Sequence, residues 1–480
     1  MSLSKGVFHR GTAFAGLWMK SLEASQTGEL YQQYRILAKV AASIITKQQT
    51  FPSKMENRLG RVPGLGLGFR LVCARKGPPK MTAIAAQPAS ETRVLSLIGI
   101  GHFLSHFYIL CLPPMLPVFA REFDVGYAML GGAIAGYAWI GGVLQAPVGA
   151  LLDKIGARQM LAAGLGLNAL AIMAIGFADG FWMFAAFAVL AGIGNSVFHP
   201  VDYAIIAAKI DEKRLGRAYS LHTFSGFFGG GVAPVAIVVL AVTFDWRTAF
   251  IVVGLAGLVA AVAILVQGDA LAGEAPTPKP TAGTSQPKSV LMTTPVLLYF
   301  LFLATYGLAM GGIGSQGVVA MTVMGLTDEA GAAQVLSAYQ FAIAAGILVG
   351  GVIAEKFGRH GLVAGICLIF AAALMMLPPV LSPVGILLFA IFIGSGFGFG
   401  VVLPARDLMV RAITPPGASG RVFGFVFVGL SIGSGLAGVA FGALVDAGGA
   451  AWVFPVAGGL LVLAVVITTL AQMAAAPKAT

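Results

Sequence analysis

The chain has 480 residues, of which 58% are hydrophobic and only 10% are charged, and its mean hydropathy is +0.89. Soluble domains have about 25% charged residues, so this composition excludes an ordinary water-soluble protein and indicates a chain that lies mostly in lipid. The net charge of +11 does not indicate a nucleic-acid partner, because residues 1–80 alone hold 13 Lys and Arg against three Glu, and the remaining residues are nearly neutral.

Residues 1–80 form a basic N-terminal extension with no apolar run of spanning length and no secretory signal with a cleavage site. Met81 then opens a short polar lead, residues 81–93, ahead of the first long apolar stretch. We expect the extension to be disordered, and either to precede a true start at Met81 or to act as a regulatory or targeting tail.

Apolar stretches of about 20 residues recur from residue 94 onward, which predicts a series of membrane-spanning helices. Twelve are expected, at residues 94–119, 127–151, 159–177, 181–208, 217–243, 248–267, 296–323, 331–353, 361–379, 384–411, 421–445 and 451–473. A linker rich in Pro, Gly, Thr and Ser, residues 268–295, divides them into bundles of six at 94–267 and 296–473, followed by a tail at 474–480.

The distribution of Lys and Arg predicts the orientation of these helices. With the N-terminus inside and residues 1–80 set aside, the inner loops and ends have 14 basic residues and the outer loops have two. We therefore expect a multi-pass protein of the bacterial inner membrane with both termini in the cytoplasm.

A loop motif follows both the second and the eighth predicted helix, at an offset of 202 residues. Its two copies comprise Gly149, Asp153, Lys154, Gly156 and Arg158, and then Gly351, Glu355, Lys356, Gly358 and Arg359. An acid among basic residues at a helix end can form ion pairs that hold the cytoplasmic side in one state. The alternative interpretation is a rigid turn that orients the chain.

The repeated motif and the six-plus-six arrangement resemble the major facilitator superfamily, whose members are built from parallel repeats of six helices. The resemblance implies an all-α membrane protein with two pseudo-symmetric bundles, in which the fourth and tenth helices face each other across a central cavity. His102, the Pro113–Pro117 segment and the Asn195–Pro200 segment further resemble the fosmidomycin-resistance group of exporters. Here the acid after the His-Pro step is Asp202 instead of residue 201, which turns it by about 100° around the helix.

Ionisable residues inside predicted spans are costly and usually functional. Asp202 and Arg406 occupy equivalent positions of the two repeats, so we predict an ion pair between them in one state, broken in another by substrate or proton. The alternative is a permanent structural pair. Asn195, His199 and Asp202 share one helix face, which is typical of a cavity wall that can transfer a proton or bind a polar solute.

Further candidates are predicted less directly from position. Asp407 and Arg411 are four residues apart near a cytoplasmic helix end and are expected to form a structural ion pair. His102 and His106 have a spacing that would permit a metal, but no third ligand is evident, so no metal site is predicted. Cavity-lining roles are expected for His102, His222, Gln316, Tyr339 and Gln340.

The sequence therefore predicts a secondary active transporter of a small organic molecule, driven by protons across the lipid bilayer. Export of a drug-like compound or metabolite is favoured, with uptake of an organic anion and a transport-inactive membrane sensor as alternatives. The chain has no nucleotide-binding loop and no enzyme-like constellation, so neither an enzyme nor a cofactor is expected. We expect a monomer with no nucleic-acid partner.

Overall fold

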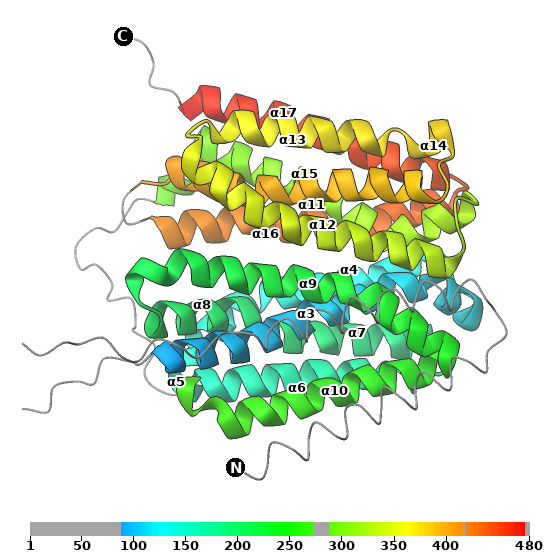
Figure 1. Cartoon of the computed structure of the whole chain (residues 1–480), viewed down its shortest axis with the longest axis horizontal. Helices are drawn as coiled ribbons and strands as arrows, with labels where there is room; N and C mark the ends of the chain where they lie inside the picture. The colour runs from blue at the N-terminus through cyan, green and yellow to red at the C-terminus, as the bar shows by residue number, and fades with distance from the viewer. Residues whose placement is uncertain (1–87, 272–287, 416–417, 476–480) are drawn as a thin grey trace, which may run out of the picture. The chain divides into compact units, whose positions relative to one another are not determined.

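The computed structural model describes residues 88–271, 288–415 and 418–475, and these residues are almost entirely helical (Figure 1). The predicted N-terminal extension, most of the linker and the end of the tail lie outside the described residues. A few side chains inside the described segments, among them those of Asp153 and Ser419, also lie outside the description.

In the described residues, the N-terminal half contains eight α-helices and the C-terminal half contains seven. The first set is α3 (Pro88–Phe123), α4 (Tyr127–Val143), α5 (Gln145–Ile155), α6 (Ala157–Ile175), α7 (Phe181–Asn195), α8 (Phe198–Lys209), α9 (Leu215–Thr243) and α10 (Trp246–Gln267). The second set is α11 (Thr294–Val323), α12 (Glu329–Lys356), α13 (His360–Met375), α14 (Pro378–Leu381), α15 (Ile386–Ala412), α16 (Ser419–Asp446) and α17 (Val453–Ala475).

Eleven helices in the described residues are long and apolar enough to cross a membrane. The remaining one of the twelve predicted spans, 127–151, is divided into the 17-residue apolar helix α4 and its continuation α5. The all-helical fold of two bundles that the sequence predicts is therefore confirmed.

Two predicted spans are each interrupted three residues before a proline. Helix α5 begins after Leu144 and has Pro147 in its first turn, and α8 begins after Val197 and has Pro200 in its first turn. Proline has no backbone N–H to donate to the preceding turn, so it weakens a continuous helix and is well tolerated where a new helix starts. The break before α8 sets the direction of the segment that contains His199 and Asp202.

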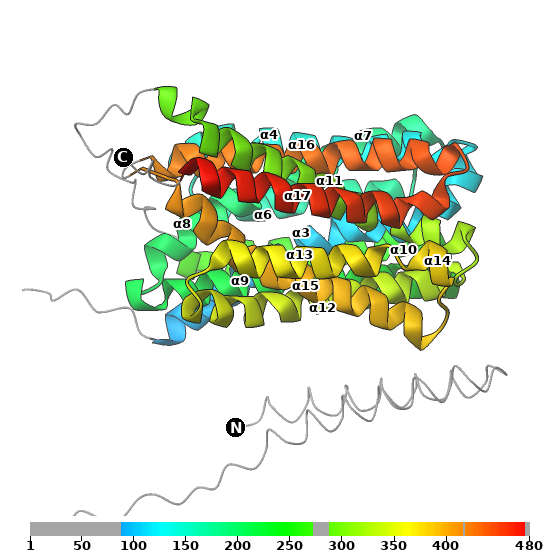
Figure 2. The ribbon, with the colours of Figure 1, turned by 90° about the horizontal axis from the view of Figure 1, so that it is seen from above.

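The most extensive contacts between the halves are those of α4 with α16 and of α9 with α12. They lie on opposite sides of the bundle when it is seen from above (Figure 2). Glycines allow the backbones to approach closely, as is typical of helix packing in lipid. Between the halves, a Cβ atom on Gly131 of α4 would collide with the carbonyl of Gly438 on α16. Within the N-terminal half, a Cβ atom on Gly229 of α9 would collide with the carbonyl of Phe103 on α3.

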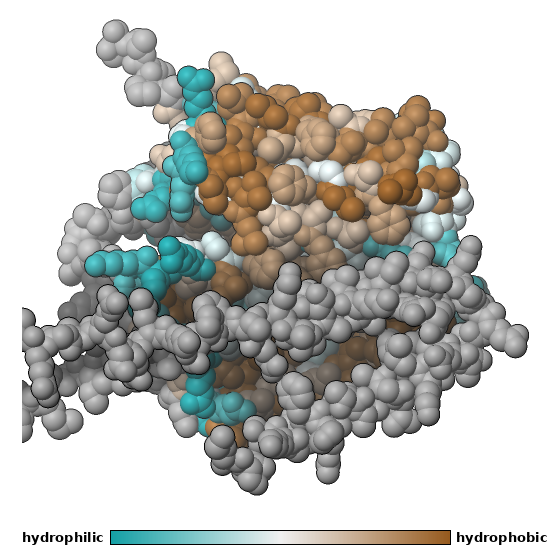
Figure 3. Space-filling view, in the orientation of Figure 1, coloured by the Kyte–Doolittle hydropathy of each residue, from teal (hydrophilic) through white to brown (hydrophobic). Residues whose placement is uncertain are grey.

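The surface is apolar over the middle of the helices, and polar residues gather toward the end at which α5 and α12 terminate (Figure 3). We call this the motif end, because both copies of the loop motif lie there, and we call the other the opposite end. An apolar band between polar ends is what a multi-pass membrane protein presents to lipid.

Candidate functional site

Five ionisable side chains from three helices meet inside the N-terminal half. Helix α3 provides His102 and His106, α8 provides His199 and Asp202, and α9 provides His222. We call this group the His–Asp cluster. The rings of His102 and His222 stack with their centroids 3.8 Å apart, and the ring of His102 also lies 4.7 Å from that of His106 and 5.3 Å from that of His199.

The carboxylate of Asp202 lies beside two of these histidines. Its Oδ2 atom is 3.7 Å from Nδ1 of His222 and 3.9 Å from Nδ1 of His102. Asp202 is fully buried, and His102 and His222 are each only 2% exposed. Both distances exceed the range of a hydrogen bond, and both oxygens of Asp202 and both Nδ1 atoms are buried without a hydrogen-bond partner.

His199 differs from the other members because its side chain is exposed. His199 is therefore the member of the cluster whose side chain can be reached from outside it. Its position follows from Pro200, which starts a new helix at this point and turns the His199–Asp202 segment toward α3 and α9.

Gly226 on α9 makes room for the cluster, and sequence reasoning did not single it out for this role. A Cβ atom there would lie 2.6 Å from Cδ2 and Nε2 of His102 and 2.9 Å from Cδ2 of His106. The absence of a side chain thus lets two histidines of α3 pack directly against the backbone of α9.

Asn195 was predicted to share a cavity face with His199 and Asp202. Its Oδ1 accepts a hydrogen bond of 3.3 Å from Nδ2 of Asn168, whose amide also bonds to the hydroxyl of Tyr137. Asn168 and Tyr137 are fully buried. This polar network holds the last turn of α7 in place, and the sequence offered no signal for Asn168 beyond its being a polar residue in an apolar span.

Arg406 on α15 is buried, and it binds within its own half. Its Nε donates a hydrogen bond of 2.8 Å to Oδ1 of Asp407, and its guanidinium lies 5.0 Å from the centre of the Phe427 ring. In this conformation Arg406 is therefore paired with Asp407, and the Asp202 carboxylate faces the histidines instead.

The predicted pairing of Asp407 with Arg411 also differs from the structure. The long side chain of Arg406 folds back onto the neighbouring carboxylate, whereas Arg411 is exposed near the end of α15, where solvent can stabilise its charge. Helical spacing favoured Arg411, four residues from Asp407, as its partner. It did not account for the buried guanidinium of Arg406, which has less solvent to stabilise its charge and binds Asp407 instead.

The remaining cavity candidates lie in the C-terminal half and are buried. Nε2 of Gln316 donates a 3.4 Å hydrogen bond to the carbonyl of Gly438, at the crossing of α11 and α16. Tyr339 packs with its ring 6.0 Å from that of Phe399, and Gln340 approaches Gly230 of α9. The hydroxyl of Tyr339 and the Oε1 atoms of Gln316 and Gln340 have no hydrogen-bond partner.

In the first motif copy, Gly156 connects α5 to α6 with φ at +88°, a backbone conformation that favours glycine. Arg158 then donates from Nε to the carbonyl of Leu265 at 2.8 Å. Both features fit the rigid-turn interpretation of the motif.

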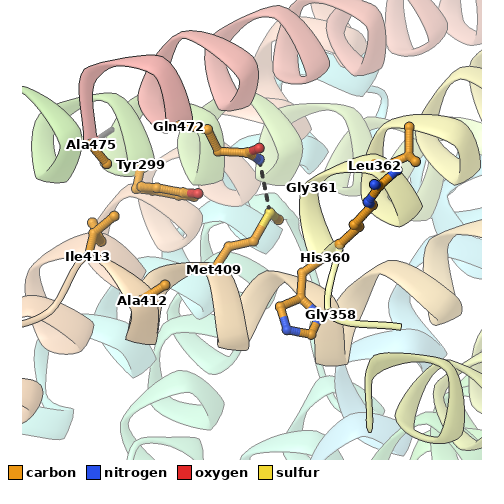
Figure 4. Close-up of a pocket in the computed structure, with 11 residues that line it drawn as sticks. Tyr299, Gly358, His360, Gly361, Leu362, Met409, Ala412, Ile413, Gln472 and Ala475 are labelled. Carbon is orange, nitrogen blue, oxygen red and sulfur yellow. Dashed lines mark hydrogen bonds between the residues drawn. The ribbon is translucent and has the colours of Figure 1, made fainter. Parts of the chain in front are cut away.

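In the second copy, Gly358 and Arg359 line a crevice with Tyr299 and His360 (Figure 4). On one wall of this crevice, Nε2 of Gln472 contacts the sulfur of Met409 at 3.4 Å. The crevice lies within the C-terminal half and is separate from the His–Asp cluster.

At the opposite end the two halves are held together by polar contacts. Arg121 and Glu329 form an ion pair at 2.7 Å. The carboxylate of Asp446 accepts hydrogen bonds of 2.8 Å from the backbone N–H groups of both Tyr127 and Ala128, at the start of α4. At the motif end, by contrast, Arg93 and Arg214 bind Gln267 and Glu91 of their own half.

The comparisons with known proteins agree with this architecture. The family profile described as Major Facilitator Superfamily matches residues 98–334 and 319–479. The chain belongs to the major facilitator superfamily. It is therefore a multi-pass membrane transporter and not an enzyme.

Three curated relatives match most of the chain. They are an uncharacterized transporter, YfnC, of Bacillus subtilis (28% identity over 74% of this chain and 87% of the relative), the fosmidomycin resistance protein of Escherichia coli (26%, over 75% and 89%) and the multi-drug resistance efflux pump PmrA of Streptococcus pneumoniae (24%, over 72% and 89%). The predicted resemblance to the fosmidomycin-resistance group is thus confirmed.

The fold is similar to that of a bacterial homologue of the human lysosomal transporter Spinster, solved in an inward-facing and occupied conformation. The TM-score is 0.64 at 16% sequence identity, with 81% of this chain and 97% of that chain covered. A likeness at this level of identity concerns the fold alone.

Proposed function

We propose that this chain exports a small drug-like compound or metabolite across the bacterial inner membrane by alternating access, driven by the proton gradient. The observation on which this depends is the His–Asp cluster, a buried carboxylate among histidines in a transporter fold. Two curated relatives that match most of the chain are named as a fosmidomycin resistance protein and a multi-drug efflux pump, which favours export.

In this proposal the motif end faces the cytoplasm, and one chain acts alone because the cluster lies within one half. The contacts of Arg121 and Asp446 close the opposite end. Substrate then enters from the motif end and reaches the exposed His199 inside the span. Rocking of the halves about the α4–α16 and α9–α12 pairs would move the closure to the motif end.

Asp202 and His199 are the proposed proton-coupling residues. A buried carboxylate without a hydrogen-bond donor is costly in its charged form. A proton that reaches Asp202 through His199 removes this cost, and its release on the other side of the membrane returns the carboxylate to its starting state. Arg406, as the equivalent residue of the other repeat, is the proposed partner of Asp202 in a different conformation.

The proposal is tested with everted membrane vesicles that contain the transporter. Fosmidomycin and a panel of antibiotics and metabolites are offered, and uptake into the vesicles is measured with and without a proton ionophore. We expect accumulation of at least one compound that the ionophore abolishes, and loss of accumulation in Asp202→Asn. Asp179→Asn changes an exposed carboxylate in the loop between α6 and α7 and is the matched control.

Accumulation that persists with the ionophore, or that Asp202→Asn leaves undiminished, contradicts proton coupling through this residue. Because uptake into everted vesicles corresponds to export from the cell, accumulation limited to right-side-out vesicles contradicts the direction.

Uptake of an organic anion is the second candidate, and Arg406 favours it. Its Nε donates a hydrogen bond to Asp407, and the face of its guanidinium packs on the ring of Phe427. These contacts fix the orientation of the guanidinium, whose other N–H groups could bind a carboxylate or phosphonate. A match to a probable L-galactonate transporter of Escherichia coli covers only 30% of this chain. Proton-dependent accumulation of an organic acid in right-side-out vesicles, lost in Arg406→Gln, would favour this candidate over export.

A further inference from the structure

The His–Asp cluster has the composition and spacing of a transition-metal site. Ligand atoms of His102, His199 and His222 all lie within 4.8 Å of one another, and Oδ2 of Asp202 faces Nδ1 of two of these histidines. The sequence showed only the His102–His106 spacing and no third ligand. The structure supplies the missing ligands from α8 and α9.

The distances within the cluster are too long for hydrogen bonds and close to those of ligands that share a metal ion. Two donors bound to one tetrahedral zinc ion at about 2.0–2.1 Å lie about 3.4 Å apart. The two Asp202–histidine separations are 3.7 and 3.9 Å.

The buried polar atoms of the cluster that have no hydrogen-bond partner are a second, independent indication of a bound cation. Both oxygens of Asp202, Nδ1 of His102 and both ring nitrogens of His222 are buried without a hydrogen-bond partner. Buried polar groups in proteins nearly always have a partner, and buried charges are paired or coordinate metals. A cation held between Asp202 and the histidines would satisfy these atoms together.

We propose that the His–Asp cluster binds one divalent transition-metal ion of the zinc, cobalt or nickel class, with His102, His222 and Asp202 as ligands and His199 as the ligand nearest the entrance. Imidazole nitrogens with one carboxylate suit these ions. Calcium and magnesium require oxygen ligands and are disfavoured. Because the metal needs the ligands without their protons, it competes with the proton that the proposed transport cycle places on Asp202.

The test uses the purified full-length protein after treatment with a chelator, and Co²⁺ as the probe because its visible absorption reports tetrahedral coordination. We expect saturation at one Co²⁺ per chain and displacement by Zn²⁺. His222→Ala and Asp202→Asn should each weaken binding by at least about tenfold. His360→Ala, a histidine of the C-terminal half outside the cluster, is the matched control and should bind as the wild type does.

Thermal unfolding gives a second measurement, since a ligand that binds only the folded state raises the melting temperature. Zn²⁺ should raise it in the wild type and in His360→Ala, but not in Asp202→Asn, whose amide keeps the size of the carboxyl group. If His222→Ala does not fold, Asp202→Asn alone decides.

The absence of a saturable Co²⁺ spectrum in the wild type, or equal affinities in all three variants, overturns the metal site. Neither result affects the transport proposal, because the vesicle assay is done without added metal. Zn²⁺ that binds as expected while Asp202→Asn still transports would instead contradict proton coupling and leave the metal site standing.

Discussion

The carboxylate of Asp446 makes the sharpest prediction about the transport cycle. It is the last residue of α16 and accepts two backbone N–H groups at the start of α4, so it joins the C-terminal half to the N-terminal half at the opposite end. The first N–H groups of a helix have no partner within the helix, and the helix dipole favours negative charge there. Asp446 meets both requirements across the interface between the halves.

The Asp446→Asn variant leaves one oxygen and replaces the other by an amide that cannot accept a hydrogen bond. Loss of a side-chain cap costs about 1 kcal/mol, and the lost charge at a helix N-terminus adds about 0.3–1 kcal/mol. Since the site is exposed, we take about 1 kcal/mol as the destabilisation of the state closed at the opposite end. This corresponds to a shift of about fivefold in the equilibrium between the two states.

Cysteine labelling can measure this shift. Ser337 on α12 is buried and accepts a hydrogen bond from the backbone of Val235 on α9, so a cysteine there is protected while the opposite end is closed. In a background without Cys73, Cys111 and Cys367, we expect a membrane-impermeant maleimide to label Ser337→Cys about five times faster when Asp446 is replaced by Asn.

Asp124→Asn is the matched control, because it removes an exposed carboxylate at the same end and asparagine tolerates the φ of +50° found there. Unchanged labelling in Asp446→Asn, or an equal acceleration in Asp124→Asn, would refute the reasoning. Gly126→Ala provides a second route to the same effect, since its Cβ would lie 2.7 Å from Oδ2 of Asp446.

Three further predictions concern other contacts. Arg121→Glu should accelerate the same labelling, and the double exchange Arg121→Glu with Glu329→Arg should restore protection; failure of the exchange to restore it would show that the ion pair does not stabilise closure. Gly226→Ala should lower thermal stability by about 1–3 kcal/mol, because its Cβ overlaps the His–Asp cluster, whereas Gly424→Ala, which meets nothing within 4 Å, should be neutral. The hydroxyl and amide of Thr248 lower the pKa of Asp245, so this cap should stabilise the protein above about pH 4 and lose its effect as the pH falls below; a stability difference between wild type and Asp245→Asn that stays constant through this range would contradict it.

The fold could be predicted from the sequence because few backbone structures are stable in lipid. Each apolar stretch must satisfy its backbone internally, so length and hydropathy determine the helices, and the repeated motif identifies the two halves. What hydropathy did not show was the pair of breaks near Leu144 and Val197. Each break lies three residues before a proline, Pro147 or Pro200, and hydropathy does not distinguish these prolines from those that lie inside the unbroken helices α3, α9 and α15.

The site was predictable as a list of residues but not as an arrangement. His102, His199, Asp202 and His222 were all selected because ionisable side chains are rare in lipid. These side chains come together only because α3, α8 and α9 are rotated about their axes so that the side chains face one another. Gly226 has no side chain, which leaves room for the histidines of α3. Nothing in a single sequence reports that rotation, so the histidines were assigned separately.

The equivalence of Asp202 and Arg406 in the two repeats does not by itself give the partners that they have in this conformation. The repeats place the two residues at matching positions, but in this conformation their neighbours lie within their own halves. Two imidazoles lie 3.7 and 3.9 Å from the Asp202 carboxylate, and Asp407 binds Arg406. The Asp202–Arg406 pair that we propose for a different conformation therefore requires the halves to move, because in this conformation Arg406 binds Asp407 and Asp202 faces the histidines.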